Sequence, residues 1–329
     1  MLKNLLMFLA IAMSFNAVAA QKINGAGATF PYPIYSKWFS EYQKTHKDVE
    51  FNYQSIGSGG GIKQVLAQTV DFGATDAPMS DAELKTAKTP IRHIPTVLGA
   101  VTVAYNVAGL PANLNLDGVT LANIFLGTVT KWNDAAIVKL NPKVKLPATD
   151  ILVVRRSDGS GTTAVFTEYL ANVSADFKTK VGAGKNVNWP SGIGAKGNEG
   201  VTAMVAQTDG AIGYTELAYA INAELKMAAM KNAKGEFVSP SVASITAAAA
   251  SVKKVDGDLR ISIINVDAKG AYPISSFTYI LLPELASAQI TATKAFLGWA
   301  LKDGQKFAAD LHYAPLPKKM SEALLKTLK

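Results

Sequence analysis

The chain has 329 residues, of which 49% are hydrophobic and 18% are charged, and it carries a formal net charge of +8. This composition excludes a disordered or fibrous chain, and the length predicts about two domains. The chain contains no cysteine, which excludes disulfides, thiolate metal sites and a lipid anchor on an amino-terminal cysteine. Its positive charge comes mostly from scattered lysines, so we expect a general attraction for anions and no dedicated nucleic-acid surface.

The first stretch, MLKNLLMFLAIAMSFNAVAA, has the pattern of a secretory signal peptide. Lys3 precedes an apolar run from Leu5 to Phe15, and small residues follow as far as Ala20. A membrane anchor is the alternative, but the run is too short to span a bilayer comfortably. We therefore expect residues 1–20 to be removed, with the junction uncertain by one residue, and the mature protein to be exported, soluble and periplasmic.

The rest of the chain alternates amphipathic helix patterns with short β-prone stretches, which predicts an α/β fold. A helix over residues 32–45 places Ile34, Tyr35, Trp38, Phe39 and Tyr42 on one face. Ser80 and Glu83 have the spacing of a capping box at a helix start. Further helices are predicted at 61–70, after residue 161, at 198–208, at 242–251 and from 290 onward, and strands at 48–55, 70–76, 94–107, 151–156, 210–214 and 272–282.

Two long β-prone stretches, near residues 97–106 and 272–282, are the expected crossing points between two lobes. If both cross, residues 21–100 and 272–329 form one lobe, and residues 101–271 form the other lobe between them in the sequence. No Pro/Ser-rich linker marks these boundaries.

Two glycine-rich loops precede helices near the start of the mature chain. In NGAGATFPYP, Gly25 and Gly27 let the backbone approach a ligand, and Thr29 adds a hydroxyl beside the amides of Thr29 and Phe30. In IGSGGGIKQ, the glycines come just before a helix, whose free amides and positive dipole end favour an anion, and Ser58 adds a hydroxyl. Neither loop is a dinucleotide fingerprint or a P-loop, and each taken alone is nearly as well explained as an ordinary turn.

The third loop is VVRRSDGSGTTAVF, which follows a strand and begins a helix. Its Ser160, Gly161 and Thr162 offer hydroxyl and amide donors at the helix start. Arg155 and Arg156 alternate across the strand, so only one faces the site, and we expect this to be Arg156 because it is nearer the turn. Arginine is a planar donor suited to tetrahedral oxyanions. Asp158 is placed to hold that guanidinium in one orientation; the alternative is a surface arginine pair beside a turn aspartate.

Asp76 ends the predicted strand of residues 70–76, where the carboxyl edge of an α/β sheet meets a cleft. Most such aspartates are ordinary loop residues. In an anion site, however, a carboxylate accepts a hydrogen bond from an anion that still carries a proton and repels one that is fully ionised. Asp76 would therefore admit monohydrogen phosphate and reject sulfate.

Together these stretches resemble one family, the periplasmic phosphate-binding proteins of the phosphate-specific ABC transport system. The resemblance rests on GAGATFPYPIYSKW, NYQSIGSGGGIKQ, VDFGATDAPMS, VVRRSDGSGTTAVFTEYL and GAIGYTELAYA, and it runs to about Leu316. It implies a two-lobed type II periplasmic-binding-protein fold with a hinged cleft that closes on inorganic phosphate. The implied ligand contacts are Thr29, Phe30, Ser58, Asp76, Arg156, Ser160, Gly161 and Thr162, with Asp158 paired to Arg156.

The resemblance also implies delivery of phosphate to the permease subunits of an ATP-driven importer in the inner membrane. It implies no cofactor and no metal, and nothing in the sequence demands more than a monomer. Gly59 stands where relatives often have serine, at a position outside the implied side-chain contacts.

An enzyme is the main alternative class. The chain has three histidines, His46, His93 and His312, and all lie away from the glycine loops in sequence. DGSGT lacks the nucleophile-elbow pattern, and no Walker or kinase loop is present. A second alternative is a binding protein for sulfate, molybdate, arsenate or an organic anion, and Asp76 argues against sulfate.

Overall fold

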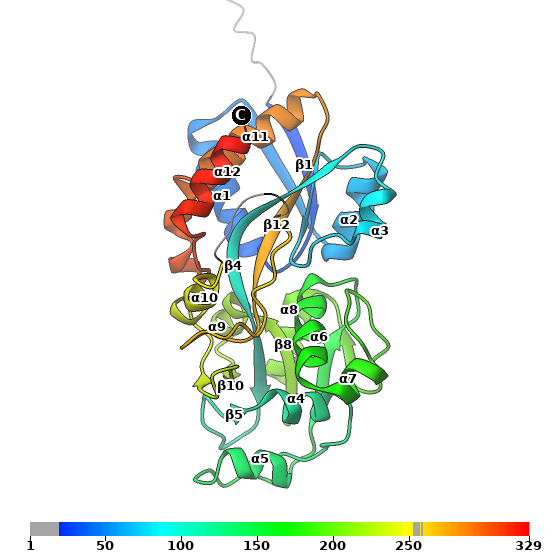
Figure 1. Cartoon of the computed structure of the whole chain (residues 1–329), viewed down its shortest axis with the longest axis vertical. Helices are drawn as coiled ribbons and strands as arrows, with labels where there is room; N and C mark the ends of the chain where they lie inside the picture. The colour runs from blue at the N-terminus through cyan, green and yellow to red at the C-terminus, as the bar shows by residue number, and fades with distance from the viewer. Residues whose placement is uncertain (1–19, 253–256, 258, 329) are drawn as a thin grey trace, which may run out of the picture.

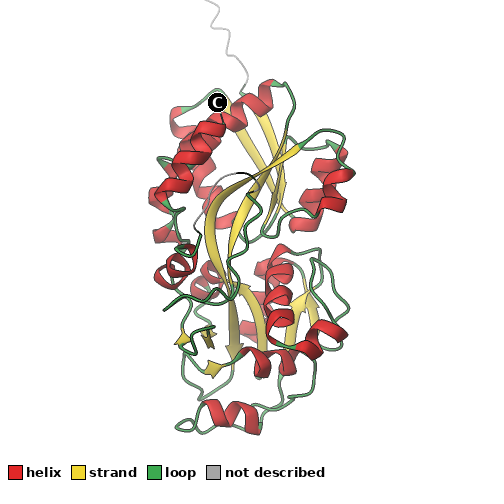
Figure 2. Cartoon of the chain, viewed as in Figure 1, coloured by secondary structure: helices red, strands yellow, loops and turns green. Residues whose placement is uncertain are grey.

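A computed structural model of the chain describes residues 20–252, 257 and 259–328. The predicted signal peptide lies outside the described residues, apart from Ala20. Two lobes are stacked along the long axis of the molecule, each with a sheet flanked by helices (Figures 1 and 2). We call them the upper and lower lobes, as drawn in Figure 1.

The upper lobe is built around parallel strands β1, β2 and β3, which continue into the antiparallel strands β12 and β4. Its strands are β1 (Gln21–Gly27), β2 (Val49–Ser55), β3 (Phe72–Thr75), β12 (Ser275–Pro283) and the first part of β4 (Ile91–Asn106). Its helices are α1 (Tyr32–Thr45), α2 (Ser58–Ala67), α3 (Asp81–Lys85), α11 (Ala288–Ala300) and α12 (Lys318–Thr327), with 3-10 turns η1 (Gly304–Phe307) and η2 (Ala309–Leu311). Helix α1 buries the five residues predicted from its periodicity, because they face the sheet.

Strand β4 runs through both lobes. Its residues up to Ala100 pair with β12, and its residues from Val101 onward pair with β8 of the lower lobe. A bulge opposite Thr278 and Tyr279 leaves Thr96 without a register partner beside Pro95, a place where a sheet tolerates proline. A single strand therefore carries the sheet from one lobe to the other, and it positions the two lobes relative to each other.

The lower lobe continues the sheet in the order β4, β8, β6, β7. Strands β6 and β8 are parallel, so their carboxyl ends meet at the same edge. The lobe contains β6 (Leu152–Arg156), β7 (Ile193–Ala195), β8 (Ala211–Glu216), β9 (Lys226–Met227), α4 (Gly118–Phe125), α5 (Ala135–Leu140), α6 (Gly161–Val173), α7 (Ala175–Lys180), α8 (Gly197–Gln207) and α9 (Leu217–Asn222). A small second sheet joins β5 (Asn115–Leu116), β10 (Ala229–Lys231) and β11 (Phe237–Val238), and α10 (Val242–Ala249) packs on β4.

Helix α2 begins earlier than the sequence suggests. The prediction started it at Gly61, but Ser58 is already helical, so the glycines form its first turn. A Cβ on Gly61 would lie 2.5 Å from the Ala26 carbonyl oxygen, so only glycine lets this turn pack directly on β1. The early start places Ser58 itself at the helix N-terminus.

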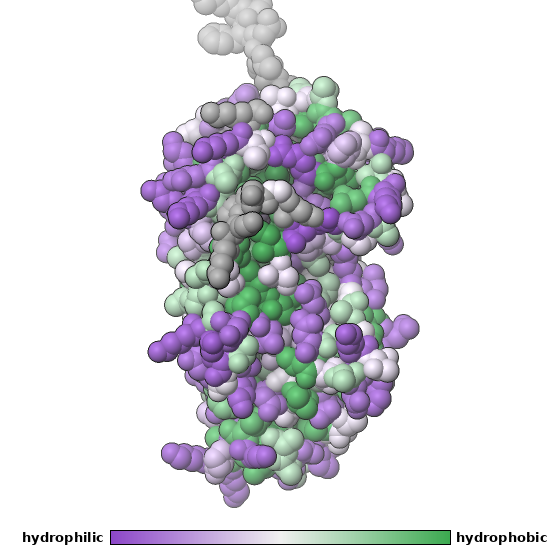
Figure 3. Space-filling model, viewed as in Figure 1, coloured by the Kyte–Doolittle hydropathy of each residue, from purple (hydrophilic) through white to green (hydrophobic). Residues whose placement is uncertain are grey.

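The surface is hydrophilic over most of the face drawn in Figure 3, and apolar residues gather in the middle of the molecule, where the lobes meet. Among the described residues, no helix is long and apolar enough to cross a membrane.

Candidate functional site

Four helices, α1, α2, α6 and α8, begin where the two lobes meet. The turn before α1 contains Thr29 and Phe30, both buried. The Thr29 carbonyl accepts a hydrogen bond from Tyr219 Oη at 2.6 Å, and the Phe30 carbonyl accepts one from Tyr313 Oη at 2.6 Å. Because a peptide unit is planar, holding the Thr29 carbonyl also fixes the orientation of the Phe30 amide, whereas Pro31, which follows Phe30, has no N–H to offer.

The start of α2 contacts the lower lobe directly. Gly57 has φ +87°, and a Cβ there would clash with the Asp158 carboxylate. Both the backbone conformation and the close contact therefore require glycine. The Gly59 amide donates to the Gly159 carbonyl at 2.8 Å, which ties the second glycine loop to the third. Ser58 is fully buried, and its Oγ accepts from the Asp76 amide at 3.3 Å.

The third loop places its arginine inside the protein. The Arg156 side chain is 1% exposed, whereas Arg155 is only partly buried. Arg156 Nε donates to Asp158 Oδ1 at 2.7 Å, its Nη2 pairs with Oδ2, and its Nη1 donates to Thr162 Oγ1 at 3.3 Å. Although burial favours the neutral acid, the hydrogen bonds and charge of Arg156 hold the pKa of Asp158 below its ordinary value. The pair is therefore charged, and the guanidinium is held in one plane.

The first turn of α6 holds the remaining predicted donors. Ser160 caps the helix by accepting from the Thr163 amide at 3.0 Å, and Ser160, Gly161 and Thr162 are all buried. A Cβ on Gly161 would lie 2.6 Å from Asp76 Oδ2 and 2.8 Å from the Asp76 amide. The third loop of the lower lobe thus lies directly against Asp76 of the upper lobe.

Asp76 is the acceptor among these donors. It is 1% exposed, and its Oδ1 accepts from Thr278 Oγ1 at 3.0 Å. Burial raises the pKa of Asp76 to about 7, and Thr278, Arg156 and Ser58 act in the opposite direction. Near neutral pH, Asp76 can therefore either accept or hold a proton, which suits a group that shares a proton with a ligand.

The structure thus brings together all nine residues singled out from the sequence, from both lobes. It also adds Asn198, which the sequence analysis missed. Asn198 Nδ2 donates to Thr29 Oγ1 at 2.7 Å and to Thr162 Oγ1 at 3.2 Å. The only local signal is an asparagine after a glycine at a predicted helix start, a common pattern that does not point to a site.

Lys185 joins the two lobes beside the site. Lys185 Nζ lies 3.1 Å from Glu83 Oε2, while the Lys185 carbonyl accepts from the Ser160 amide at 2.9 Å. Burial favours the neutral form of Glu83, but the Ser80 amide and the Lys185 ammonium hold its pKa below the ordinary value. Lys185 therefore connects the third loop to α3, which begins with the capping box predicted at Ser80.

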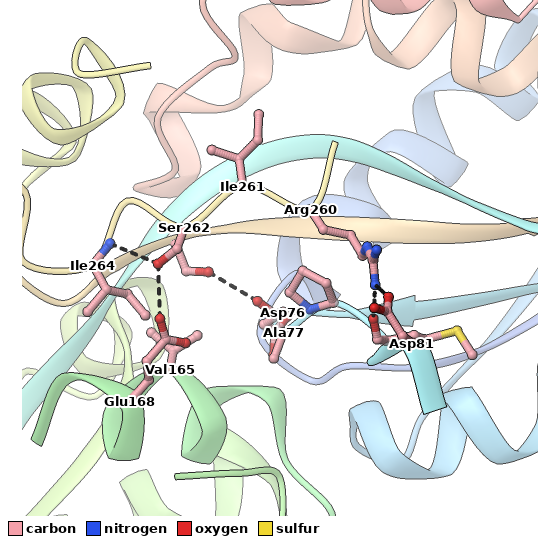
Figure 4. Close-up of a pocket in the computed structure, with 12 residues that line it drawn as sticks. Asp76, Ala77, Asp81, Val165, Glu168, Arg260, Ile261, Ser262 and Ile264 are labelled. Atoms are coloured by element: carbon pink, nitrogen blue, oxygen red, sulfur yellow. Dashed lines mark hydrogen bonds and ion pairs between the residues drawn. The ribbon is translucent and has the colours of Figure 1, made fainter. Parts of the chain in front are cut away.

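A cavity of about 430 Å³ lies beside Asp76 (Figure 4). Residues 260–262 line this cavity and contact both lobes. Arg260 Nη1 donates to Asp81 Oδ1 of the upper lobe at 2.7 Å, and Ser262 Oγ donates to Glu168 Oε1 of the lower lobe at 3.1 Å. Arg260 lies in the range predicted for the lower lobe, yet these contacts place it against the upper one. Asp76 is thus buried between the donor loops on one side and this cavity on the other.

Two lobes that share a strand and close around helix N-termini, hydroxyls and one arginine define an anion-specific substrate-binding protein. The sequence matches the family model described as PBP superfamily domain over residues 16–303. It is similar to phosphate-binding protein PstS of Xylella fastidiosa, with 47% identity over 300 residues that cover 90% of this chain and 82% of that one. The chain belongs to the PBP superfamily and, within it, to the family of the phosphate-binding proteins PstS.

Other comparisons agree with this assignment. Phosphate-binding protein PstS of Pasteurella multocida is 45% identical over 324 residues, which cover 97% of this chain and 93% of that one. A solved high-affinity periplasmic phosphate-binding protein bound with phosphate has a TM-score of 0.74 at 23% identity, covering 92% of this chain and 93% of that one. The solved structure shows that the two chains share their fold, and the expected two-lobed binding-protein fold is confirmed.

Proposed function

We propose that this protein captures inorganic phosphate between its lobes and delivers it to the permease subunits of an ATP-driven importer in the inner membrane. The names of the PstS relatives and the phosphate-bound structural neighbour support the ligand. The net charge of +8 supports long-range attraction of an anion. We further propose that the protein is periplasmic, monomeric and free of cofactors and metals.

The proposed ligand contacts share one property: each residue is buried and offers a hydroxyl, amide, guanidinium or carboxylate group where the lobes meet. They are Thr29, Phe30, Ser58, Asp76, Arg156, Ser160, Gly161 and Thr162, and Asp158 orients Arg156. The observation that carries the proposal is that the carboxylate Asp76 lies directly against the donor-rich start of α6. An anion bound there is surrounded by donors and meets one acceptor, so an anion that keeps one proton is favoured over sulfate.

Closure is the proposed mechanism. Bonds such as Asn198 to Thr29 and Gly59 to Gly159 join the lobes, so they form only in the closed arrangement. An anion that bridges donors from both lobes binds the closed form more tightly and shifts the population toward it. The permease would then recognise the closed protein rather than the ligand.

We favour binding without turnover over the enzyme alternative. His93 Nε2 accepts from the Met79 amide at 3.0 Å, and His46 stacks on Tyr42 with ring centroids 3.8 Å apart, so both have structural contacts. Within residues 20–252, 257 and 259–328, no three His, Cys, Asp or Glu side chains are grouped closely enough to hold a metal ion.

The test is calorimetric titration of the mature, phosphate-stripped protein with phosphate, repeated in excess sulfate. We expect tight one-to-one binding that sulfate leaves intact. Arg156→Ala should weaken it by about 30-fold or more, because truncating one partner of a buried charge pair costs about 2–5 kcal/mol. Arg155→Ala is the matched control and should bind like the wild type. No phosphate binding, or binding abolished by sulfate, would refute the proposal, and wild-type affinity in Arg156→Ala would remove Arg156 from the site.

A further inference from the structure

Asn198 is a fully buried residue of α8 that joins a hydroxyl of each lobe. Its Nδ2 donates to Thr29 Oγ1 of the upper lobe at 2.7 Å and to Thr162 Oγ1 of the lower lobe at 3.2 Å. Both hydrogens of the carboxamide are therefore committed to these two threonines.

The orientation of this carboxamide is fixed by its contacts with β8. Its Oδ1 lies 3.0 Å from the Glu216 amide nitrogen and 3.3 Å from Thr215 Oγ1. A backbone amide can only donate, so the carboxamide oxygen must face β8 and the nitrogen must face the threonines. If the carboxamide were flipped, its NH₂ group would face the Glu216 amide, which is also a donor, and its oxygen would face the two threonine hydroxyls.

The threonine hydroxyls then have no acceptor capacity left. Thr29 Oγ1 accepts from Asn198 Nδ2 and also from the Asn198 amide at 3.1 Å. Thr162 Oγ1 accepts from Asn198 Nδ2 and from Arg156 Nη1 at 3.3 Å. A hydroxyl has two lone pairs and one hydrogen, so each threonine retains only its hydrogen to offer.

We propose that Asn198 is a positioning residue that makes the hydroxyls of Thr29 and Thr162 obligatory donors, and so biases the cleft toward phosphate carrying one proton over phosphate carrying two. This inference rests on the proposed function. With both threonines committed as donors, Asp76 is the principal acceptor for a ligand proton. A second ligand proton would meet one of the threonine hydrogens and weaken binding.

The ionisable groups around Asn198 and the two threonines come from every element packed there. They are Asp76 after β3, Arg156 and Asp158 at the end of β6, Glu199 on α8, Glu216 at the end of β8, Tyr219 on α9 and Tyr313 near the C-terminus. All of them are retained when Asn198 alone is replaced. Their contribution to the pH dependence of binding is therefore common to wild type and variant and cancels in a comparison.

The experiment measures phosphate affinity by calorimetry from about pH 8.5 to about pH 5.5 for the wild type, Asn198→Ala and Asn198→Ser. Serine is the milder change, and it tests the inference if the alanine variant folds poorly. We expect each variant to bind about tenfold more weakly at high pH. We also expect a shallower loss of affinity toward low pH, so that the variant and wild-type affinities converge.

The matched control is Asn141→Ala, which removes another buried carboxamide. Asn141 Nδ2 donates to the Asn115 carbonyl at 2.9 Å and to the Ile137 carbonyl at 3.0 Å, far from the cleft at α5. This variant should be less stable but should keep the wild-type affinity and pH slope. A constant factor between Asn198 variants and wild type at every pH would mean a merely structural role and overturn the inference, as would wild-type affinity. Wild-type protein that fails to bind phosphate would instead overturn the proposed function, and this inference with it.

Discussion

Gly161→Ala tests whether the structure describes the ligand-binding, closed state. The added methyl group would lie 2.6 Å from Asp76 Oδ2, 2.8 Å from the Asp76 amide and closer still to Ser58 Oγ. All three atoms belong to the upper lobe, whereas Gly161 begins α6 in the lower lobe. The clash therefore arises only when the lobes meet.

The size of the effect follows from these contacts. Separations below 3.0 Å to a backbone amide and a buried carboxylate require the surroundings to shift, and overpacking of this kind costs about 1–3 kcal/mol. If the cost falls on the closed state alone, phosphate affinity should drop about 5- to 150-fold. The open protein should not be destabilised, because alanine is a better helix former than glycine.

Two assays separate these effects: calorimetric titration with phosphate, and thermal unfolding of the phosphate-free protein. Gly298→Ala is the matched control, since a Cβ at this position in α11 meets no atom within 4 Å apart from its chain neighbours and the backbone of its own helix. It should leave affinity unchanged and raise stability by about 0.5–1 kcal/mol. Wild-type phosphate affinity in Gly161→Ala would contradict the closed geometry on which the site depends.

Four further outcomes are expected. Asp76→Asn should let sulfate compete with phosphate, because the amide no longer repels a fully ionised anion; continued failure of sulfate to compete would reject the filter. In the wild type, sulfate competition should increase as the pH falls below about 7, where Asp76, whose pKa burial raises to about 7, gains a proton and can donate. The proton on Asp76 stabilises the folded protein fully below the ordinary pKa of 3.8, and this stabilisation is lost as the pH rises through about 7. The free energy of unfolding of the ligand-free wild type should therefore fall over this pH range, and that of Asp76→Asn should lack this fall. Lys185→Met should weaken phosphate binding about two- to fivefold and speed release in stopped-flow measurements, since its contact with Glu83 joins the lobes; an unchanged release rate would mean that this pair does not hold the cleft closed.

Elements that have a periodic pattern could be predicted from the sequence alone. The apolar spacing of residues 32–45 predicted the buried face of α1, and the Ser80 and Glu83 spacing predicted a capping box that is present. Alternation along β6 predicted that only one of its two arginines faces the site, the position of Arg156 next to the turn favoured it, and Arg156 is buried. Glycine and hydroxyl residues before predicted helices marked the three loops, since free helix amides attract anions wherever they occur.

Which distant groups meet depends on the packing of the whole chain. Asn198 lies 169 positions from Thr29, and Lys185 lies 102 positions from Glu83, and neither pair has a local pattern that announces the contact. The early start of α2 was also missed, because it depends on how closely Gly61 packs on β1. Helix and strand patterns repeat over a few residues and can be read along the chain, whereas hydrogen bonds across a cleft depend on how two lobes close, which no short stretch of sequence encodes.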